Sequence, residues 1–262
     1  DFEQLSRRIG PGELRWIDQR DMYEDLYLLS LARTEKVLQE YAVETKDCGI
    51  LWQNQDITVI DLPKTGDFRR ILVDFGNIYV GQLVFTLRAA AGTVIDIYGF
   101  ENYYRREIDD TIGLNNSVHY VASEGWQTYQ CMARMGLRYA LITVRGAREP
   151  VEISDFHLRH ETYSAPALGQ FACSDMLLNR IFEMCRDTNL LCTEDAFTDS
   201  PTYEQAFWTG DAQLSALIHA WVFGDYDFCT YVEKLAVTAQ DNGLVMNALT
   251  PTDWNTAIPM WM

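Results

Sequence analysis

Long apolar runs and positive charge are both scarce in this chain. Its 262 residues contain no stretch of eighteen consecutive apolar residues, so no segment has the length that a membrane-spanning helix needs. Lysine and arginine together number 21 against 38 aspartates and glutamates, which gives a net charge of -17. Because nucleic acids and anionic membrane surfaces would repel so acidic a chain, we expect neither as a partner.

Cysteine and histidine are also sparse, and neither is clustered. The six cysteines include no C-x-x-C pair, which argues against a disulfide framework and favours free thiols. His157 and His160 lie in an alternating, strand-like stretch without a third ligand nearby. We therefore predict no metal ion and no cofactor. His219 is spaced among apolar residues of a helical stretch, and a structural role is expected for it.

The start of the chain bears on the compartment. The first thirty residues are charged and lack the apolar core of a signal peptide. Together with the free cysteines, this favours the cytoplasm. The chain begins at Asp1 and not at a methionine, as if excised from a longer sequence, so a secreted or periplasmic location stays open. Nothing in the sequence indicates an oligomeric state.

The residue patterns divide the chain into three regions. Residues 1–49 are mixed, with helical spacing over residues 22–41. Residues 50–165 contain short β-rich runs separated by turn signals such as Gly76-Asn77, which is typical of an antiparallel β-sandwich. After Pro166 the apolar period changes from two to 3.6, so residues 166–262 are predicted to be helical. The predicted fold class is mixed β and α.

Three helices are predicted in the last region. The first follows Ser174-Asp175, which offers an N-cap and a first-turn acid, and it has an apolar stripe. The second begins near Asp211. The third begins near Tyr226 and is expected to close at Asn242-Gly243.

An acidic loop links the first two of these helices. Thirteen residues from Asp199 to Asp211 hold three carboxylates, one indole and both proline and glycine. Paired carboxylates beside an aromatic ring are what glycoside cleavage needs, because one acid protonates the leaving oxygen while the ring packs on the sugar. An acidic connector with a core tryptophan would have the same composition.

The loop resembles the signature of the bacterial α-L-rhamnosidase family of glycoside hydrolases. The matching pattern is Asp199-x-Pro-x-x-Glu204-x-x-x-Trp208-x-Gly-Asp211, and the preceding segment 171–181 is similar to the family's entry into its catalytic barrel. Three further short matches lie in the β-rich region, at Asp74-Phe-Gly76, Gly81 and Gly136-Leu-Arg138-Tyr139. The resemblance therefore extends from residue 74 to the end of the chain.

The resemblance implies an (α/α)6 catalytic barrel that releases terminal α-L-rhamnose with inversion. It implies that Glu204 is the general acid, that Asp199 and Asp211 hold rhamnose hydroxyls, and that Trp208 lines the sugar subsite. Phe207 and Trp208 are expected to give Glu204 apolar cover. Ser200 and Tyr203 depart from the cysteine and the basic residue of many members, which leaves the leaving-group preference open.

The resemblance also implies a general base far downstream, and no carboxylate of this chain is assigned to that role. Residues 168–262 have room for roughly five or six helices, whereas an (α/α)6 barrel has twelve. We therefore expect the chain to hold the first part of a barrel, to expose an apolar flank and to be inactive alone. The implied partner is a rhamnose-containing glycoside or oligosaccharide.

Two other functions remain compatible with these patterns. One is a non-catalytic carbohydrate-binding protein, in which Tyr103, Tyr104 and Trp126 would form an aromatic platform on the sandwich. The other is a different (α/α)6 glycoside hydrolase or phosphorylase with another sugar. A second acid facing Glu204 in a complete barrel would distinguish the enzymes from the binding protein.

Overall fold

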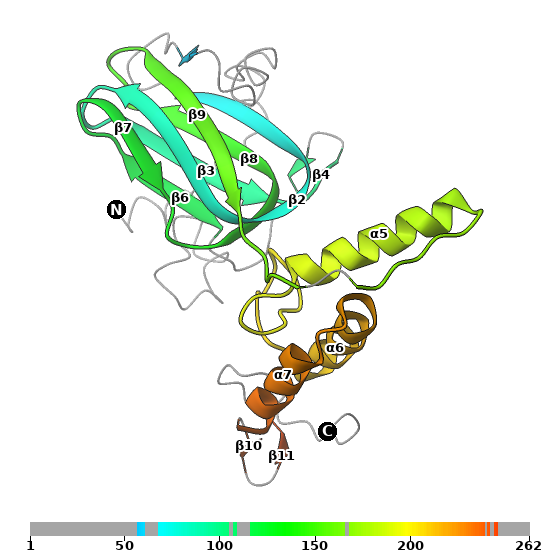
Figure 1. Cartoon of the computed structure of the whole chain (residues 1–262). Coiled ribbons are helices and arrows are strands. Elements are labelled where there is room, and N and C mark those ends of the chain that lie inside the picture. The colour runs from blue at the N-terminus through cyan, green and yellow to red at the C-terminus, as the bar shows by residue number, and fades with distance from the viewer. Residues whose placement is uncertain are drawn as a thin grey trace. The chain divides into compact units, whose positions relative to one another are not determined.

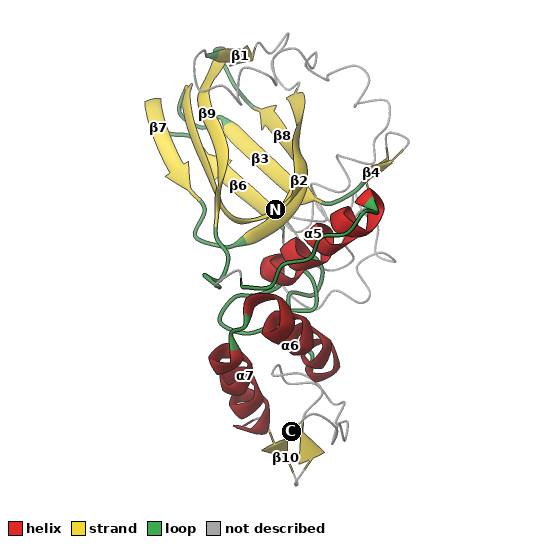
Figure 2. Cartoon of the chain, turned by 45° about the vertical axis from the view of Figure 1, so that its right-hand side comes forward, coloured by secondary structure: helices red, strands yellow, loops and turns green. Residues whose placement is uncertain are grey.

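The computed structural model describes residues 57–60, 68–104, 107–108, 116–165, 168–238, 240–241 and 244–245. The chain divides between residues 160 and 161 into a β unit and a helical unit, and each has a hydrophobic core of its own (Figures 1 and 2). The helix predicted over 22–41, with the whole of segment 1–49, lies outside the described residues.

The β unit consists of antiparallel strands. In chain order they are β1 (Thr58–Ile60), β2 (Phe68–Ala89), β3 (Val94–Phe100), β4 (Tyr103–Tyr104), β5 (Glu107–Ile108), β6 (Ser117–Val121), β7 (Gly125–Gln130), β8 (Met135–Arg145) and β9 (Val151–His160). The order in the main sheet is β1-β9-β2-β8-β3-β6, and β7 also pairs with β2. Strands β4 and β5 form a separate pair.

Strand β2 takes part in both layers of the sandwich. Its first half pairs with β8 from Phe68 to Gly81, and its second half lies between β9 and β7. Gly81 stands at the change of partner, where an added Cβ would overlap the carbonyl oxygen of Arg159. Only glycine lets the two backbones approach so closely.

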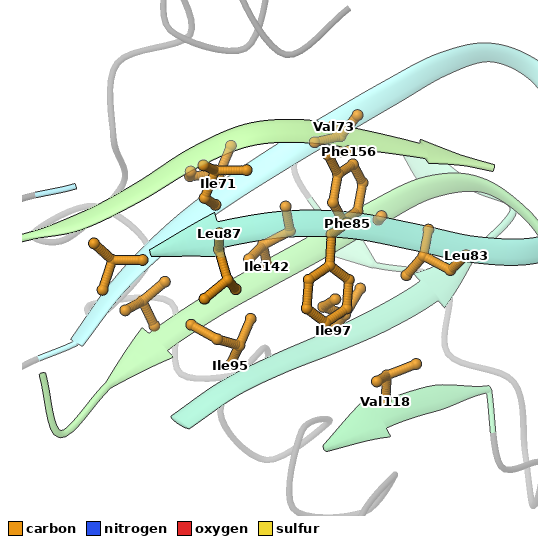
Figure 3. Close-up of a cluster of buried hydrophobic side chains, with 14 of the residues drawn as sticks. Ile71, Val73, Leu83, Phe85, Leu87, Ile95, Ile97, Val118, Ile142 and Phe156 are labelled. Atoms are coloured by element: carbon orange, nitrogen blue, oxygen red, sulfur yellow. The ribbon is translucent and has the colours of Figure 1, made fainter. Parts of the chain in front are cut away.

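The core of the β unit lies between these layers. Leu83, Phe85 and Leu87 of β2 alternate inward and face Ile95 and Ile97 of β3 (Figure 3). Residues two apart on a strand point to the same face, so this alternation buries one face of each layer. The predicted antiparallel sandwich followed by helices is confirmed.

The strand end predicted at Gly76-Asn77 is wrong, because β2 continues through it. The pairing with β8 shifts register between Asp74 and Tyr79, so the glycine serves a bulge and not a turn. Gly76 has a φ of 84°, and its N–H donates to Asp74 Oδ1 at 2.8 Å. The same oxygen accepts from Arg138 Nε at 3.0 Å, which pins the bulge to β8.

The helical unit contains α5 (Met176–Leu191), α6 (Thr209–Phe223) and α7 (Tyr226–Thr238). Asp175 caps α5, since its carboxylate accepts from the N–H of Leu177 at 2.8 Å. It is therefore the cap itself and not a first-turn acid. Gly224, with a φ of 69°, ends α6 in the left-handed conformation that favours glycine.

The predicted end of the third helix is wrong. Helix α7 ends at Thr238, and a short antiparallel pair follows, β10 (Gln240–Asp241) with β11 (Leu244–Val245). Strand β10 begins at Gln240, so the helix has ended before the chain reaches Asn242-Gly243, which lies outside the described residues.

Helix α6 packs against both α5 and α7. Ala212 and Ala216 of α6 are buried with Phe228, Val232 and Ala236 of α7. Many of the larger apolar residues of α5 and α6 are exposed, although Phe223 is buried. The exposed ones are Met176, Leu177, Leu178, Ile181, Met184, Leu214, Leu217, Ile218 and Trp221. Both helices therefore expose apolar side chains. Among the described helices, none combines the length and hydropathy needed to span a membrane.

Candidate active site

Buried phenylalanines stand on both sides of the part of the acidic loop that carries its first two carboxylates. Phe197 precedes the first carboxylate and Phe207 follows the second, and both belong to the core of the helical unit. A bridge between Thr193 and Phe197 orders the chain where it leaves α5. The segment between the two rings is therefore presented by a packed core, as is common for catalytic loops.

Asp199 closes the base of this loop. Its N–H donates to the carbonyl oxygen of Ala206 at 3.0 Å, and its Oδ1 accepts from the N–H of Ala206 at 2.9 Å. The hydroxyl of Ser200 lies 3.1 Å from Asp199 Oδ2. Asp199 thus has a structural task that the sequence motif does not reveal, and Oδ2 is the oxygen with capacity left for a ligand.

Glu204 stands at the tip of the loop and is exposed. Its φ is 36°, and that of the next residue, Gln205, is 50°. The N–H of Gln205 points to the carbonyl oxygen of Tyr203, so Glu204 is the central residue of a three-residue turn. The expected apolar cover is not found, because Phe207 is buried in the core and the described residues leave Glu204 open to solvent.

Trp208 and Asp211 stand at the start of α6. Trp208 is the N-cap residue, and its carbonyl accepts from the N–H of Ala212 at 2.8 Å. Its half-buried indole has an Nε1 that is shielded from solvent and finds no acceptor among the described residues. Asp211 is exposed in the first turn, where the helix dipole favours a negative charge. All four predicted residues thus lie on one loop and the first turn of the helix that follows it.

A buried polar network in the helical unit joins His219 to Asn189 and Thr193, two residues that the sequence did not single out. His219 of α6 is fully buried, and its Nδ1 lies 3.0 Å from Asn189 Oδ1 of α5. The Asn189 amide nitrogen donates to the carbonyl oxygen of Ser215 at 3.0 Å, so the oxygen is left to accept from the histidine. The Thr193 hydroxyl completes the network by donating to the backbone carbonyl oxygen of Asn189 at 2.6 Å.

Aromatic rings surround the imidazole of His219, and the nearest is Phe223 at 4.8 Å between centroids. Burial lowers the pKa of His219, and the nearby Asp225 carboxylate acts weakly in the opposite direction. Its Nε2 is buried without a partner in the described part of the chain. A neutral imidazole that donates from Nδ1 fits this environment, and the expected structural role is consistent with it.

The other two histidines singled out in the sequence each contact an acceptor oxygen. His157 lies 3.0 Å from Asp155, and His160 Nδ1 lies 2.8 Å from the carbonyl oxygen of Val80. Within the described ranges no three histidines, cysteines or acids are grouped as metal ligands would be. The described cysteines are free, with two of them exposed, Cys173 and Cys185.

The aromatic residues of the alternative platform lie on different groups of strands, Tyr103 and Tyr104 on the separate β4–β5 pair and Trp126 on β7. The Tyr103 ring lies 6.0 Å from that of Tyr139 on β8, whereas Trp126 is on β7, opposite Arg88 of β2. Of the Tyr104 side chain nothing is described. The described rings therefore do not form a single platform.

The chain thus places a β-sandwich before a helical unit that presents an acidic loop with an indole. Comparison with family models identifies both units. Residues 64–160 match the bacterial α-L-rhamnosidase concanavalin-like domain, and residues 166–262 match the bacterial α-L-rhamnosidase six-hairpin glycosidase domain. The chain belongs to the bacterial α-L-rhamnosidase family.

Solved structures agree with this assignment. A GH78 family rhamnosidase of Bacillus sp. GL1 is 36% identical, with a TM-score of 0.72 over 78% of this chain and 21% of that one. A Klebsiella oxytoca rhamnosidase with rhamnose bound is 19% identical, with a TM-score of 0.61 over 74% of this chain and 40% of that one. A Streptomyces avermitilis α-L-rhamnosidase complexed with L-rhamnose is 20% identical, with a TM-score of 0.57 over 73% and 21%.

The similarity to the Klebsiella and Streptomyces structures, at 19% and 20% identity, shows a shared fold and nothing more. No curated protein sequence matches the chain. The chain spans about a fifth of the length of the Bacillus enzyme.

Proposed function

We propose that the whole protein hydrolyses terminal, non-reducing α-L-rhamnose from glycosides or oligosaccharides, with inversion of the anomeric centre. The observation that carries this proposal is the loop from Asp199 to Asp211, which presents an exposed carboxyl group at its tip within a domain that matches the rhamnosidase family. The rhamnose bound by the Klebsiella and Streptomyces relatives supports the choice of sugar.

In this proposal Glu204 is the general acid. The tip of the loop leaves its carboxyl group free to reach a glycosidic oxygen, and protonation of that oxygen lets the aglycone depart as a neutral alcohol. A base on the opposite side of the sugar activates the attacking water, at roughly 6.5–9.5 Å from the acid in inverting enzymes. None of the carboxylates of this chain is assigned as that base.

Asp199, Trp208 and Asp211 hold the sugar. The Oδ2 of Asp199 and the exposed carboxylate of Asp211 can accept hydrogen bonds from rhamnose hydroxyls, and the half-buried Trp208 offers an apolar surface to the ring. Such contacts raise the rate when they strengthen in the transition state. They do not depend on how readily the aglycone leaves.

The test is Glu204→Gln in the whole protein. The amide keeps the shape of the side chain and removes its transferable proton, so kcat/KM for an alkyl or sugar aglycone should fall roughly 10²–10⁴-fold. An activated aryl rhamnoside needs less protonic help and should lose much less. Glu183→Gln on exposed α5 is the matched control and should retain activity on both substrates.

Equal losses for good and poor leaving groups would remove Glu204 from the acid role. Activity on other α-linked sugars with none on rhamnosides would instead show that the substrate is wrong while the class of reaction is right.

A further inference from the structure

Two successive residues at the tip of the loop have a backbone conformation that L-amino acids rarely adopt. Glu204 and Gln205 have φ values of 36° and 50°, and in the part of the chain that the structure describes no other residue except glycine has a positive φ. Such a conformation persists only where neighbouring contacts hold it. Neither residue is buried, so core packing does not supply those contacts.

Two side-chain hydrogen bonds hold the turn from either side of Glu204. The amide Nε2 of Gln205 donates to the carbonyl oxygen of Pro201 at 2.7 Å. The hydroxyl of Ser200 lies 2.7 Å from the carbonyl oxygen of Tyr203 and farther from Asp199, so its single hydrogen serves the carbonyl better. The carbonyl group before Glu204 and the side chain of the residue after it are therefore both tied to the incoming limb of the loop, at Ser200 and Pro201.

The bond from Gln205 is the more informative of the two. An exposed glutamine amide is ordinarily hydrated, and folding it back costs side-chain entropy. Here the side chain returns over four residues to the backbone, and it belongs to the residue that follows the proposed acid in the sequence. Its contact lies entirely within the loop, and the loop itself is anchored below by Phe207.

We propose that Gln205 is a positioning residue for Glu204, whose bond to Pro201 sets the left-handed turn and with it the direction of the Glu204 carboxyl group. The inference rests on the proposed function of Glu204. If the bond is lost, the turn can relax toward negative φ and carry the carboxyl group away from the glycosidic oxygen. A displacement of about 1 Å of a reacting group can cost about 10²-fold in rate.

The experiment compares Gln205→Met with Gln205→Lys in the whole protein. Methionine has the length of glutamine but no donor, whereas lysine retains an N–H donor with similar reach. Gln205→Met should lower kcat for the poor leaving group about 10–100-fold and lower it less for the activated aryl rhamnoside. KM should change little, and Gln205→Lys should recover much of the loss.

Gln170→Met is the matched control, because Gln170 is exposed in the same unit but outside the loop, and it should retain wild-type kcat. The thermal midpoint of every variant separates a local effect from a loss of folding. Equal losses on both substrates, a change confined to KM or to the thermal midpoint, or unchanged kcat in Gln205→Met would overturn the inference.

A double variant separates this inference from the proposed function. If Gln205 acts through Glu204, adding Gln205→Met to Glu204→Gln should cause little further loss, since the group being positioned is already gone. Multiplicative losses would show that Gln205 acts independently of Glu204. Glu204→Gln alone, by its leaving-group dependence, tests the acid role whatever the cycle shows.

Discussion

Replacing Asp199 tests whether one carboxylate both closes the loop and holds the sugar. Its Oδ1 accepts the Ala206 N–H at 2.9 Å, and the backbone pair between the same residues remains in any variant. Asp199→Asn keeps an acceptor but not the charge. A hydrogen bond to a charged group contributes about 1.5–3 kcal/mol and a neutral one about 0.5–1.5. We expect Asp199→Asn to destabilise by about 1 kcal/mol.

Asp199→Ala removes the acceptor altogether and leaves the Ala206 N–H without its partner, so a loss of about 2 kcal/mol is expected. Chemical denaturation of the whole protein would give these free energies of unfolding. The matched controls are Asp195→Asn and Asp195→Ala, because Asp195 is exposed near the start of the same loop. Both controls should stay within about 0.5 kcal/mol of the wild type.

The catalytic consequence is independent of the aglycone. Asp199→Asn should lower kcat/KM by a similar factor for alkyl and activated aryl rhamnosides, since contacts to sugar hydroxyls do not depend on the leaving group. A loss concentrated on the poor leaving group would transfer the acid role to Asp199. Unchanged stability in Asp199→Ala would show that the carboxylate does not close the loop, and the structural reasoning would then fail.

Two further predictions concern the buried histidine and the strand crossing. Burial lowers the pKa of His219 in the folded protein. Between this pKa and the unfolded pKa of about 6.5, the unfolded chain therefore binds more protons than the folded one. The contribution of His219 to the free energy of unfolding is complete above about pH 6.5 and is lost as the pH falls toward the folded pKa. After correction for intrinsic rates, hydrogen exchange of the α5–α7 amides should therefore be faster at pH 5 than at pH 7.5. His219→Gln should lessen this pH dependence, whereas His157→Gln, at an exposed position, should not. An equal pH response in both variants would contradict the assignment. Gly81→Ala should lower the thermal midpoint far more than Gly76→Ala, because a Cβ at residue 81 overlaps the Arg159 carbonyl whereas one at residue 76 meets nothing within 4 Å, and equal shifts would refute the close approach.

Periodicity was enough to predict the order of the two units, since alternation marks the strands and 3.6-residue spacing marks the helices. It could not predict that β2 crosses a bulge at Gly76, because a left-handed glycine suits a bulge and a turn alike. Periodicity also could not predict that Leu217 and Trp221 of α6 are exposed. That helix has apolar residues on both sides, and periodicity does not say which side the small Ala212 and Ala216 will bury.

The candidate site, too, could be predicted only in part from the sequence. The motif named Asp199, Glu204, Trp208 and Asp211, and all four lie on the loop and the helix start. The backbone of the tip was not predictable, because glutamate and glutamine carry no preference for positive φ. Contacts across the loop select that conformation, and they depend on how Ser200, Pro201 and Gln205 are arranged in space.

The crossing of β2 between layers has a consequence for synthesis on the ribosome. All three strands that flank β2 come after it in the chain, and the last contact joins Val80 to His160, 80 residues later. At about 5–20 residues per second, several seconds pass before the last of these partners emerges. Unpaired edges recruit other chains, so the nascent β unit is most exposed to misassembly between the emergence of β2 and that of β9.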